Sequence, residues 1–166
     1  MPDERATGQR WTKQEGGNVQ VKRLQGVYLI RLEPGEEVIG SLRKFASAYR
    51  VGFAALSAIG TFERVTLGYY DTDSKTYRNK SWDEPVEVLT MTGNISRGPD
   101  GERIVHAHVI VGRSDYSTLG GHVLEATTGP TLEVTLHTAP TTVRRQHDAD
   151  TGLNLWDLSG VETHAA

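Results

Sequence analysis

The stretch IVHAHVIV, residues 104–111, says more about the fold than any other part of this 166-residue chain. It is rich in β-branched residues and short for a helix, which favours a strand. Side chains two residues apart on a strand share a face, so His106 and His108 are expected on the same side. The opposite side would carry the apolar residues that face a core: Val105, Ala107, Val109 and Val111.

A third histidine, His122, follows two glycines a short distance further on. If a neighbouring strand carries it, three neutral imidazoles converge on one point and can bind zinc, with a fourth position left for water or substrate. The sequence therefore predicts a metal site, with zinc as the expected cofactor, held by His106, His108 and His122. The alternative is that these are structural histidines satisfied by backbone hydrogen bonds.

Composition limits the fold and the chemistry. The chain has 37% hydrophobic residues, enough for one domain with a core, and no cysteine, so any metal must be held by nitrogen or oxygen. Eighteen basic residues against 21 acidic ones give a net charge of -3. This balance argues against the broad phosphate-binding surface that nucleic-acid binders usually carry.

The amino terminus and the apolar runs bear on location. Residues 1–19 are polar and without periodicity, which predicts a flexible leader rather than a signal peptide. No apolar run approaches the roughly 20 residues needed to cross a bilayer. A cytoplasmic protein without membrane contact is therefore expected.

The rest of the chain predicts one helix and a series of strands. Val38, Leu42, Phe45 and Tyr49 recur at helical spacing, with Glu36 and Glu37 expected in the first turn. Strands are predicted at residues 26–32, 53–59, 65–70, 76–79, 86–95, 104–111, 122–126 and 131–138, with turns between them, one of them at 128–130. One main helix packed on a largely antiparallel sheet is an α+β fold.

Motifs spread over most of the chain share their order with a known family. They are LEPGEE at 32–37, AIG at 58–60, TLG at 66–68, VEVLTMTGN at 86–94, LEV at 132–134, and Gly101, Gly120 and Gly121 with the three histidines. Together they resemble the plants and prokaryotes conserved (PPC) domain family, in its prokaryotic stand-alone form with a histidine trio. Residues 145–153 resemble the family's carboxy-terminal segment, which places the domain at 20–158 and a tail at 159–166.

The resemblance implies a subunit of a homotrimer whose three histidines hold a metal, with zinc expected. In plant members the domain follows a basic DNA-binding arm, which this chain lacks, and residues 85–87 are Pro-Val-Glu where plant members have Arg-Phe-Glu. The resemblance therefore implies an assembly or partner-binding module, linked to DNA-binding regulators. It does not imply specific DNA binding by this chain alone; a protein partner or a small-molecule ligand is expected instead.

A zinc-dependent enzyme is the alternative function. The family's fold is similar to that of acetolactate decarboxylase, which has a tri-histidine zinc site, so a hydrolase or decarboxylase acting on a small carbonyl, ester or acid substrate is considered. Glu87 is the predicted catalytic residue, moving a proton beside the metal, with Glu125 and Glu133 as weaker candidates. Arg113 and Tyr70 are considered as anion-binding residues. A cupin fold also places His-x-His on a strand, but the glutamate it needs after His108 is absent.

Overall fold

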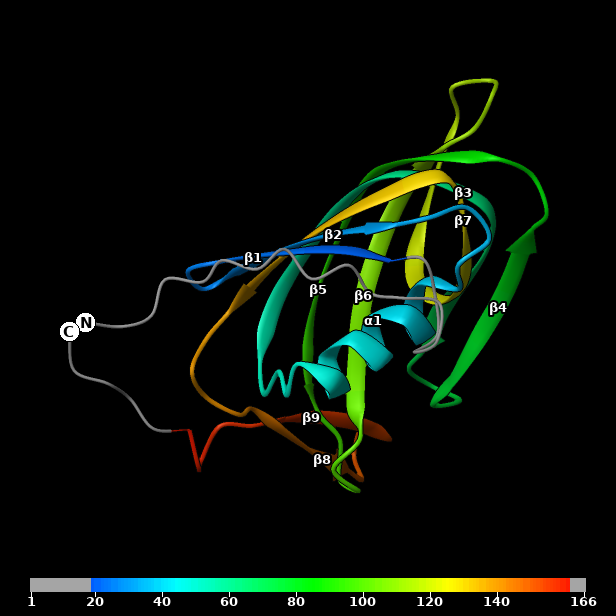
Figure 1. Ribbon diagram of the computed structural model, residues 1–166. Coiled ribbons are helices and arrows are strands. Elements are labelled where there is room, and N and C mark those ends of the chain that lie inside the picture. The colour runs from blue at the N-terminus through cyan, green and yellow to red at the C-terminus, as the bar shows by residue number, and fades with distance from the viewer. Residues whose placement is uncertain (1–18, 162–166) are drawn as a thin grey trace.

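Nine strands and one helix make up most of residues 19–161, the part of the chain that the computed structural model describes. In chain order they are β1 (Gln20–Leu24), β2 (Val27–Leu32), α1 (Val38–Ala48), β3 (Ala54–Asp71), β4 (Thr76–Trp82), β5 (Val86–Arg97), β6 (Arg103–Gly112), β7 (Thr118–Thr138), β8 (Arg144–Asp148) and β9 (Leu153–Asp157). The prediction of one main helix with many strands is confirmed (Figure 1).

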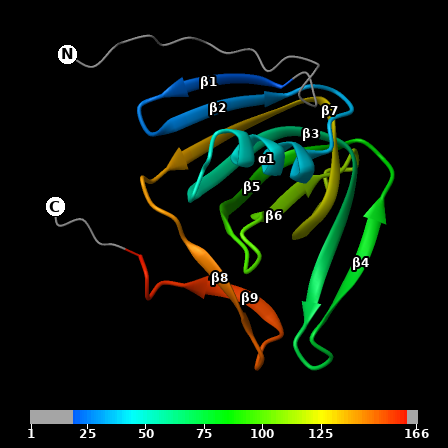
Figure 2. The ribbon, with the colours of Figure 1, turned by 60° about the horizontal axis from the view of Figure 1, so that its bottom comes forward.

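The strands form one sheet in the order β1-β2-β7-β3-β5-β8-β9, with β4 beside β3 and β6 joined to β5 and β7. Both β3 and β6 pair with β5 and with β7, so these four strands close a hydrogen-bonded circuit. The sheet is antiparallel except where β5 meets β8. Figure 2 shows α1 in front of the curled sheet, between β1–β2 at one edge and β8–β9 at the other.

Strand β6 alternates between core and surface, as its sequence predicts. Its four inward side chains are all buried: Val105, Ala107, Val109 and Val111. They pack in a continuous core with the buried face of α1 and the inner faces of β3, β5 and β7. The outward face of β6 is thereby left to His106 and His108.

Helix α1 begins at Val38, so Glu36 and Glu37 both precede the first turn in which the sequence places them. Glu37 lies outside the first turn as the N-cap, and its carboxylate accepts hydrogen bonds from the backbone amides of Ile39 and Gly40. A carboxylate is favourable at either position, because the free amides and the dipole at a helix N-terminus attract negative charge. Among residues 19–161, no helix is long and apolar enough to span a bilayer.

Two pairs of predicted strands are in fact single long strands. β3 runs from Ala54 to Asp71 and β7 from Thr118 to Thr138, and the predicted turn at 128–130 lies inside β7. The β3–β7 register shifts between Gly60 and Phe62. Pro130 falls at this irregularity, where a missing backbone N–H costs no regular ladder bond. Turn residues here mark a bulge that bends the strand rather than ending it.

Three short strands were not predicted: β1, β8 and β9. Most of their side chains are exposed, so no alternating apolar pattern marks them. The predicted leader at 1–19 lies outside the described residues except for Val19, as does the tail predicted at 159–166 from residue 162 onward. The domain limits of 20–158 stay a prediction.

Close packing of β5 on β6 is expected to make Gly93 intolerant of any side chain. A Cβ added there would overlap the His106 carbonyl oxygen and lie 2.7 Å from Ala107 Cα, whereas a Cβ at Gly112 meets only Leu89 side-chain atoms, the nearest at 3.4 Å. Gly93→Ala should lower the free energy of unfolding by about 1–3 kcal/mol, as overpacking against backbone does. Chemical denaturation measures this, with Gly112→Ala as the control; equal stability of the two variants would contradict it.

Candidate metal centre

Two paired strands deliver the three histidines to one place. His106 and His108 project from the outward face of β6, and His108 is directly opposite His122 of β7 in the antiparallel register. His108 is exposed, while His106 and His122 are partly buried. The predicted sharing of a strand face and the predicted neighbouring strand are therefore both found.

The three imidazoles form a nearly equilateral group. Their ring centroids are separated by 5.1, 5.3 and 5.3 Å, and one nitrogen from each ring lies within 4.8 Å of the other two. Nε2 of His106 and Nε2 of His108 are 3.3 Å apart. In a tetrahedral zinc site with Zn–N bonds of about 2.0–2.1 Å, neighbouring nitrogens lie about 3.3–3.4 Å apart. The spacing of these two nitrogens thus fits a shared zinc ion.

A second observation on His122 bears on the same point. Its Nδ1 is buried and has no hydrogen-bond partner among the described residues. Buried polar atoms are nearly always paired, because losing water without gaining a partner costs free energy. A metal ion would supply the missing partner, so the residues present fit the group that the sequence predicts.

The surroundings keep two of the imidazoles neutral. Burial, together with smaller contributions from the nearby His106, His108 and Arg145, lowers the pKa of His122 to about 4. Burial also lowers the pKa of His106, followed by the charges of Arg145 and His108. Only the neutral imidazole has a free electron pair for a metal, so near pH 7 both rings are ready to act as ligands.

Strand β4 covers one side of the group with an aromatic ring. The ring of Tyr77 lies 5.1 Å from that of His122 and 5.0 Å from that of Tyr70. Gly68 makes this possible, because a Cβ at that position would lie 2.7 Å from the Tyr77 ring. Burial raises the pKa of the Tyr77 hydroxyl, with a further contribution from Tyr70.

Strand β8 places a guanidinium on another side of the group. Arg145 is 7% exposed and donates hydrogen bonds to Asn94 Oδ1, Ser96 Oγ and the Asn154 carbonyl oxygen, at 2.9, 2.8 and 2.7 Å. Its Nη2 also lies 3.3 Å from Nδ1 of His106. Burial lowers the pKa of this arginine, which still remains charged at neutral pH.

The structure does not bring the predicted carboxylates to the histidines. Glu87, Glu125 and Glu133 are all exposed, so the buried environment considered for Glu87 and Glu133 is not found. Glu87 pairs with Gly112, four residues along β6 from His108. Four strand residues span about 13 Å. The group that could hold a metal contains three histidines and, within residues 19–161, no carboxylate.

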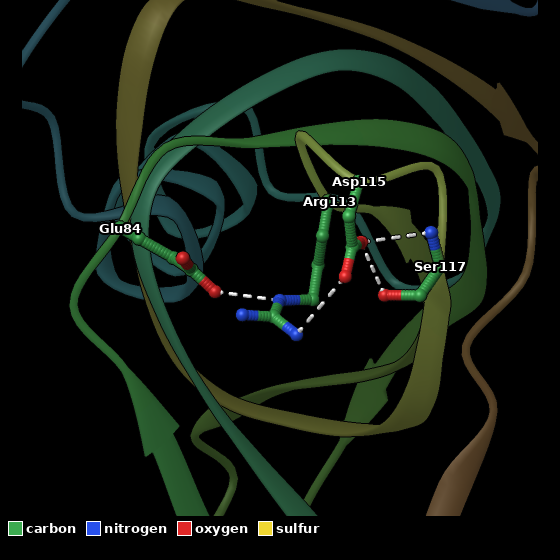
Figure 3. Close-up of polar contacts among 4 residues, drawn as sticks. All are labelled: Glu84, Arg113, Asp115 and Ser117. Carbon is green, nitrogen blue, oxygen red and sulfur yellow. Dashed lines mark hydrogen bonds and ion pairs between the residues drawn. The ribbon is translucent and has the colours of Figure 1, made fainter.

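The two predicted anion-binding residues are engaged elsewhere. Arg113 donates to Glu84 at 2.7 Å and lies 3.8 Å from Asp115, which in turn accepts from Ser117 (Figure 3). This ion pair ties the loop after β6 to the loop before β5. The Tyr70 hydroxyl donates to the Thr151 carbonyl oxygen at the tip of the β8–β9 hairpin. Neither side chain takes part in the histidine group.

Two residues beside the histidines were missed as site residues. Tyr77 falls in the strand predicted at 76–79, and Arg145 falls in the segment that resembles the family's carboxy terminus. Both come from hairpins that are distant in sequence from the histidines, so spacing along the chain does not reveal them. No local pattern marks either one: Tyr77 reaches the site because β4 pairs with β3, where Tyr77 lies opposite Tyr70 and Asn79 opposite Gly68.

Comparison with known proteins identifies relatives of this fold. The family model described as the Plants and Prokaryotes Conserved (PCC) domain matches residues 20–140. A search of curated proteins finds no match.

Several solved structures are similar over most of their length. A candidate DNA-binding protein from Bacteroides thetaiotaomicron is 29% identical, with 84% of this chain and 96% of that chain covered and a TM-score of 0.81. A metal-containing protein from Archaeoglobus fulgidus is 31% identical, with 82% and 94% covered and a TM-score of 0.73. A plant- and prokaryote-conserved (PPC) protein from Pyrococcus horikoshii is 28% identical, with 84% and 94% covered and a TM-score of 0.74.

The low pKa of His122 predicts that the free energy of unfolding of the metal-free protein falls at acidic pH. Its folded-state pKa is lowered from 6.5 to about 4, so between these values the unfolded chain binds the proton more tightly. Stability from this group is complete above pH 6.5 and is lost as the pH falls towards 4. In chelator-treated protein, the Tm should fall more steeply over this range for the wild type than for His122→Gln. If Tm fell equally with pH in the two proteins, the lowered pKa of His122 would be refuted.

Proposed function

This chain belongs to the Plants and Prokaryotes Conserved domain family, abbreviated PCC or PPC, and from that premise we propose that it is a zinc-binding subunit of a homotrimer that serves as an assembly or partner-binding module. The observation that carries the proposal is the convergence of His106, His108 and His122, with one nitrogen from each within 4.8 Å of the others. A module of this kind needs a folded unit and an accessible site; the continuous core and the exposed His108 support these two requirements.

The donor set supports zinc as the metal. Three imidazole nitrogens suit zinc, whereas calcium and magnesium prefer oxygen ligands. The similar protein from Archaeoglobus fulgidus is described as metal-containing, which supports a metal at this site without identifying it. When bound, zinc supplies a Lewis-acidic position that can accept water or one further ligand.

The exposure of His108 supports an open site. Structural zinc sites normally have four protein ligands and are closed, whereas sites that act on or bind small molecules keep a position free. Here three protein ligands converge and one of them faces solvent. The site is therefore suited to a small-molecule ligand that reaches it from outside.

An apolar strip beside the histidines supports assembly. Ile59, Leu89 and Ile110, on the neighbouring strands β3, β5 and β6, are 59%, 52% and 47% exposed. Ile110 points to the same side of β6 as His108, two residues away. Exposed apolar side chains grouped on one sheet face are typical of surfaces that another protein covers. A second copy of the chain on this strip would agree with the trimer that the family resemblance implies.

The relatives described as candidate DNA-binding proteins raise the question of DNA contact. We do not expect specific DNA binding by this chain alone, because its net charge is -3 and phosphate neutralisation supplies most of the affinity of DNA-binding proteins. A role alongside a separate DNA-binding regulator stays within the proposal.

A zinc-dependent enzyme acting on a small carbonyl, ester or acid is the second candidate function. The open fourth position favours it, since three neutral ligands leave the metal its full positive charge. The exposed position of Glu87, about 13 Å along the strands from His108, does not favour the proton-transfer role predicted for it. Any such reaction would depend on other proton donors near the site.

Zinc content should depend on all three histidines. Replacing His106, His108 or His122 singly by alanine is expected to reduce zinc from about one per chain to a small fraction, because two histidines are too few ligands for a stable site. The measurement is metal analysis of protein purified without a histidine tag. His137→Ala is the matched control, since His137 is exposed near the end of β7. Full zinc in all three site variants would rule out the assignment.

The mass in solution should correspond to a trimer. Analytical ultracentrifugation of the wild type is expected to give about three times the chain mass of 18.3 kDa. Ile110→Asp should shift the protein towards the monomer, because a charge in a buried apolar interface is costly. Tyr116→Asp, at a loop position that is 94% exposed, should leave the mass unchanged. A wild-type monomer would remove the assembly part of the proposal.

A further inference from the structure

Arg145 is a buried charge without an opposite charge beside it. Among the described residues its hydrogen-bond acceptors are an amide, a hydroxyl and a backbone carbonyl, all of them neutral. A guanidinium that is only 7% exposed has lost most of its hydration, which costs several kcal/mol unless an anion is close. The Trp156 ring, whose centroid lies 5.8 Å from the guanidinium carbon, adds a cation–π contact, but none of these partners carries a negative charge.

The charge is directed at the histidine group. Arg145 Nη2 lies 3.3 Å from His106 Nδ1. The metal-binding group contains, within residues 19–161, no carboxylate. Three neutral ligands would add nothing to offset a divalent metal, so metal and guanidinium together form a centre of concentrated positive charge.

We infer that the metal-loaded histidine centre binds a small oxyanion, such as a carboxylate or phosphate, and that Arg145 is the residue that selects an anion over a neutral oxygen donor. The inference rests on the proposed metal site and names the class of ligand for its open position. An anion satisfies at once the two features that the protein leaves unmet, the free coordination position and the uncompensated charge.

Arg145 acts through its field rather than by reaching the ligand. Its bonds to Asn94 and Ser96 of β5 and to Asn154 of β9 hold the guanidinium in place, so it cannot swing outward. A fixed charge in a partly buried site is screened far less than one on the surface. The exposed side of the group, at His108, leaves a path for a ligand from solvent. Arg145 is thus a specificity-determining residue and need not contact the bound anion.

Arg145 lies outside the residues that the family model matches, in the segment that resembles the family's carboxy terminus. The family model ends at residue 140, and β8 begins at Arg144. The histidines lie within the matched residues, whereas the charge that biases their ligand comes from the hairpin β8–β9 that follows them. The choice of ligand can therefore change without disturbing the metal-binding strands.

The test measures anion binding to cobalt-loaded protein, because Co²⁺ takes the place of zinc and its visible absorption reports a change of ligand. Wild type, Arg145→Gln and Arg144→Gln are first compared for cobalt content. Acetate, inorganic phosphate and acetamide are then titrated into each. Arg144→Gln is the matched control, because Arg144 is the exposed neighbour on the same strand and its loss changes the net charge equally.

The expected result is that wild type and Arg144→Gln bind acetate and phosphate alike, while Arg145→Gln keeps its cobalt and binds both anions at least about tenfold more weakly, as the loss of one nearby charge requires. Acetamide should bind weakly to all three. Arg145→Lys, which keeps the charge and loses the planar fork, should recover most of the anion affinity, whereas a purely structural role would leave it as weak as Arg145→Gln.

Equal anion affinity in wild type and Arg145→Gln, with cobalt bound in both, overturns this inference and leaves the metal site standing. Failure of the wild type to bind cobalt overturns the proposed metal site and the inference with it. If Arg145→Gln does not fold, the lysine variant and the wild-type preference for acetate over acetamide decide. A wild type that binds acetamide as well as acetate refutes the selection of anions.

Discussion

The pairing of β6 with both β5 and β7 is the constraint on which the rest of the structure depends. It closes the circuit of four strands and sets His108 opposite His122. Because side chains alternate along a strand, the same register that buries Val109 also exposes His108. A slip of one residue would place imidazoles in the core and valines at the surface. Core and candidate site are therefore fixed together.

The candidate site combines neutral bases with a fixed cation, and these two features oppose each other in metal binding. Burial lowers the pKa of His106 and His122, so few protons compete with a metal near neutral pH. The charge of Arg145, 3.3 Å from His106, instead repels any cation. The same arginine joins β8 to β5 through Asn94 and Ser96. The same side chain therefore weakens the binding of a metal cation and holds the β8–β9 hairpin against β5.

The sequence predicted those parts of the fold and site that depend on local pattern. The alternation in β6, the apolar face of α1 and the shared face of the histidines all follow from residues close together in the chain. The continuity of β3 and β7 did not, because a strand was predicted to end just before Gly60 and a turn was predicted at 128–130, whereas Gly60 and Pro130 lie at a bulge. Glycine and proline have the same backbone preferences in a turn and in a bulge, and only pairing with another strand tells the two apart.

The surroundings of the histidines were also beyond local pattern. Glu87 alternates with the buried Val86 and Val88, so its exposure follows the local pattern, but its distance from the histidines depends on the β5–β6 register. Arg145 and Tyr77 reach the site only because two hairpins fold towards it. Contacts between elements distant in sequence place Arg145 and Tyr77 beside the histidines, and the local sequence pattern does not predict such contacts.

Those two hairpins support each other at their tips, which bears on how the site can vary. Lys75 donates to the Ala149 carbonyl oxygen at 3.1 Å, and the Tyr70 hydroxyl donates to that of Thr151. Exposed hydrogen bonds of this kind contribute only about 0.5–1.5 kcal/mol each, far less than the burial of the β6–β7 core. The histidine scaffold is therefore the rigid part and the flanking hairpins are the adaptable part. If the histidine centre binds an anion as inferred, changes in β8 would alter its ligand preference while the β6–β7 register that places the imidazoles is preserved.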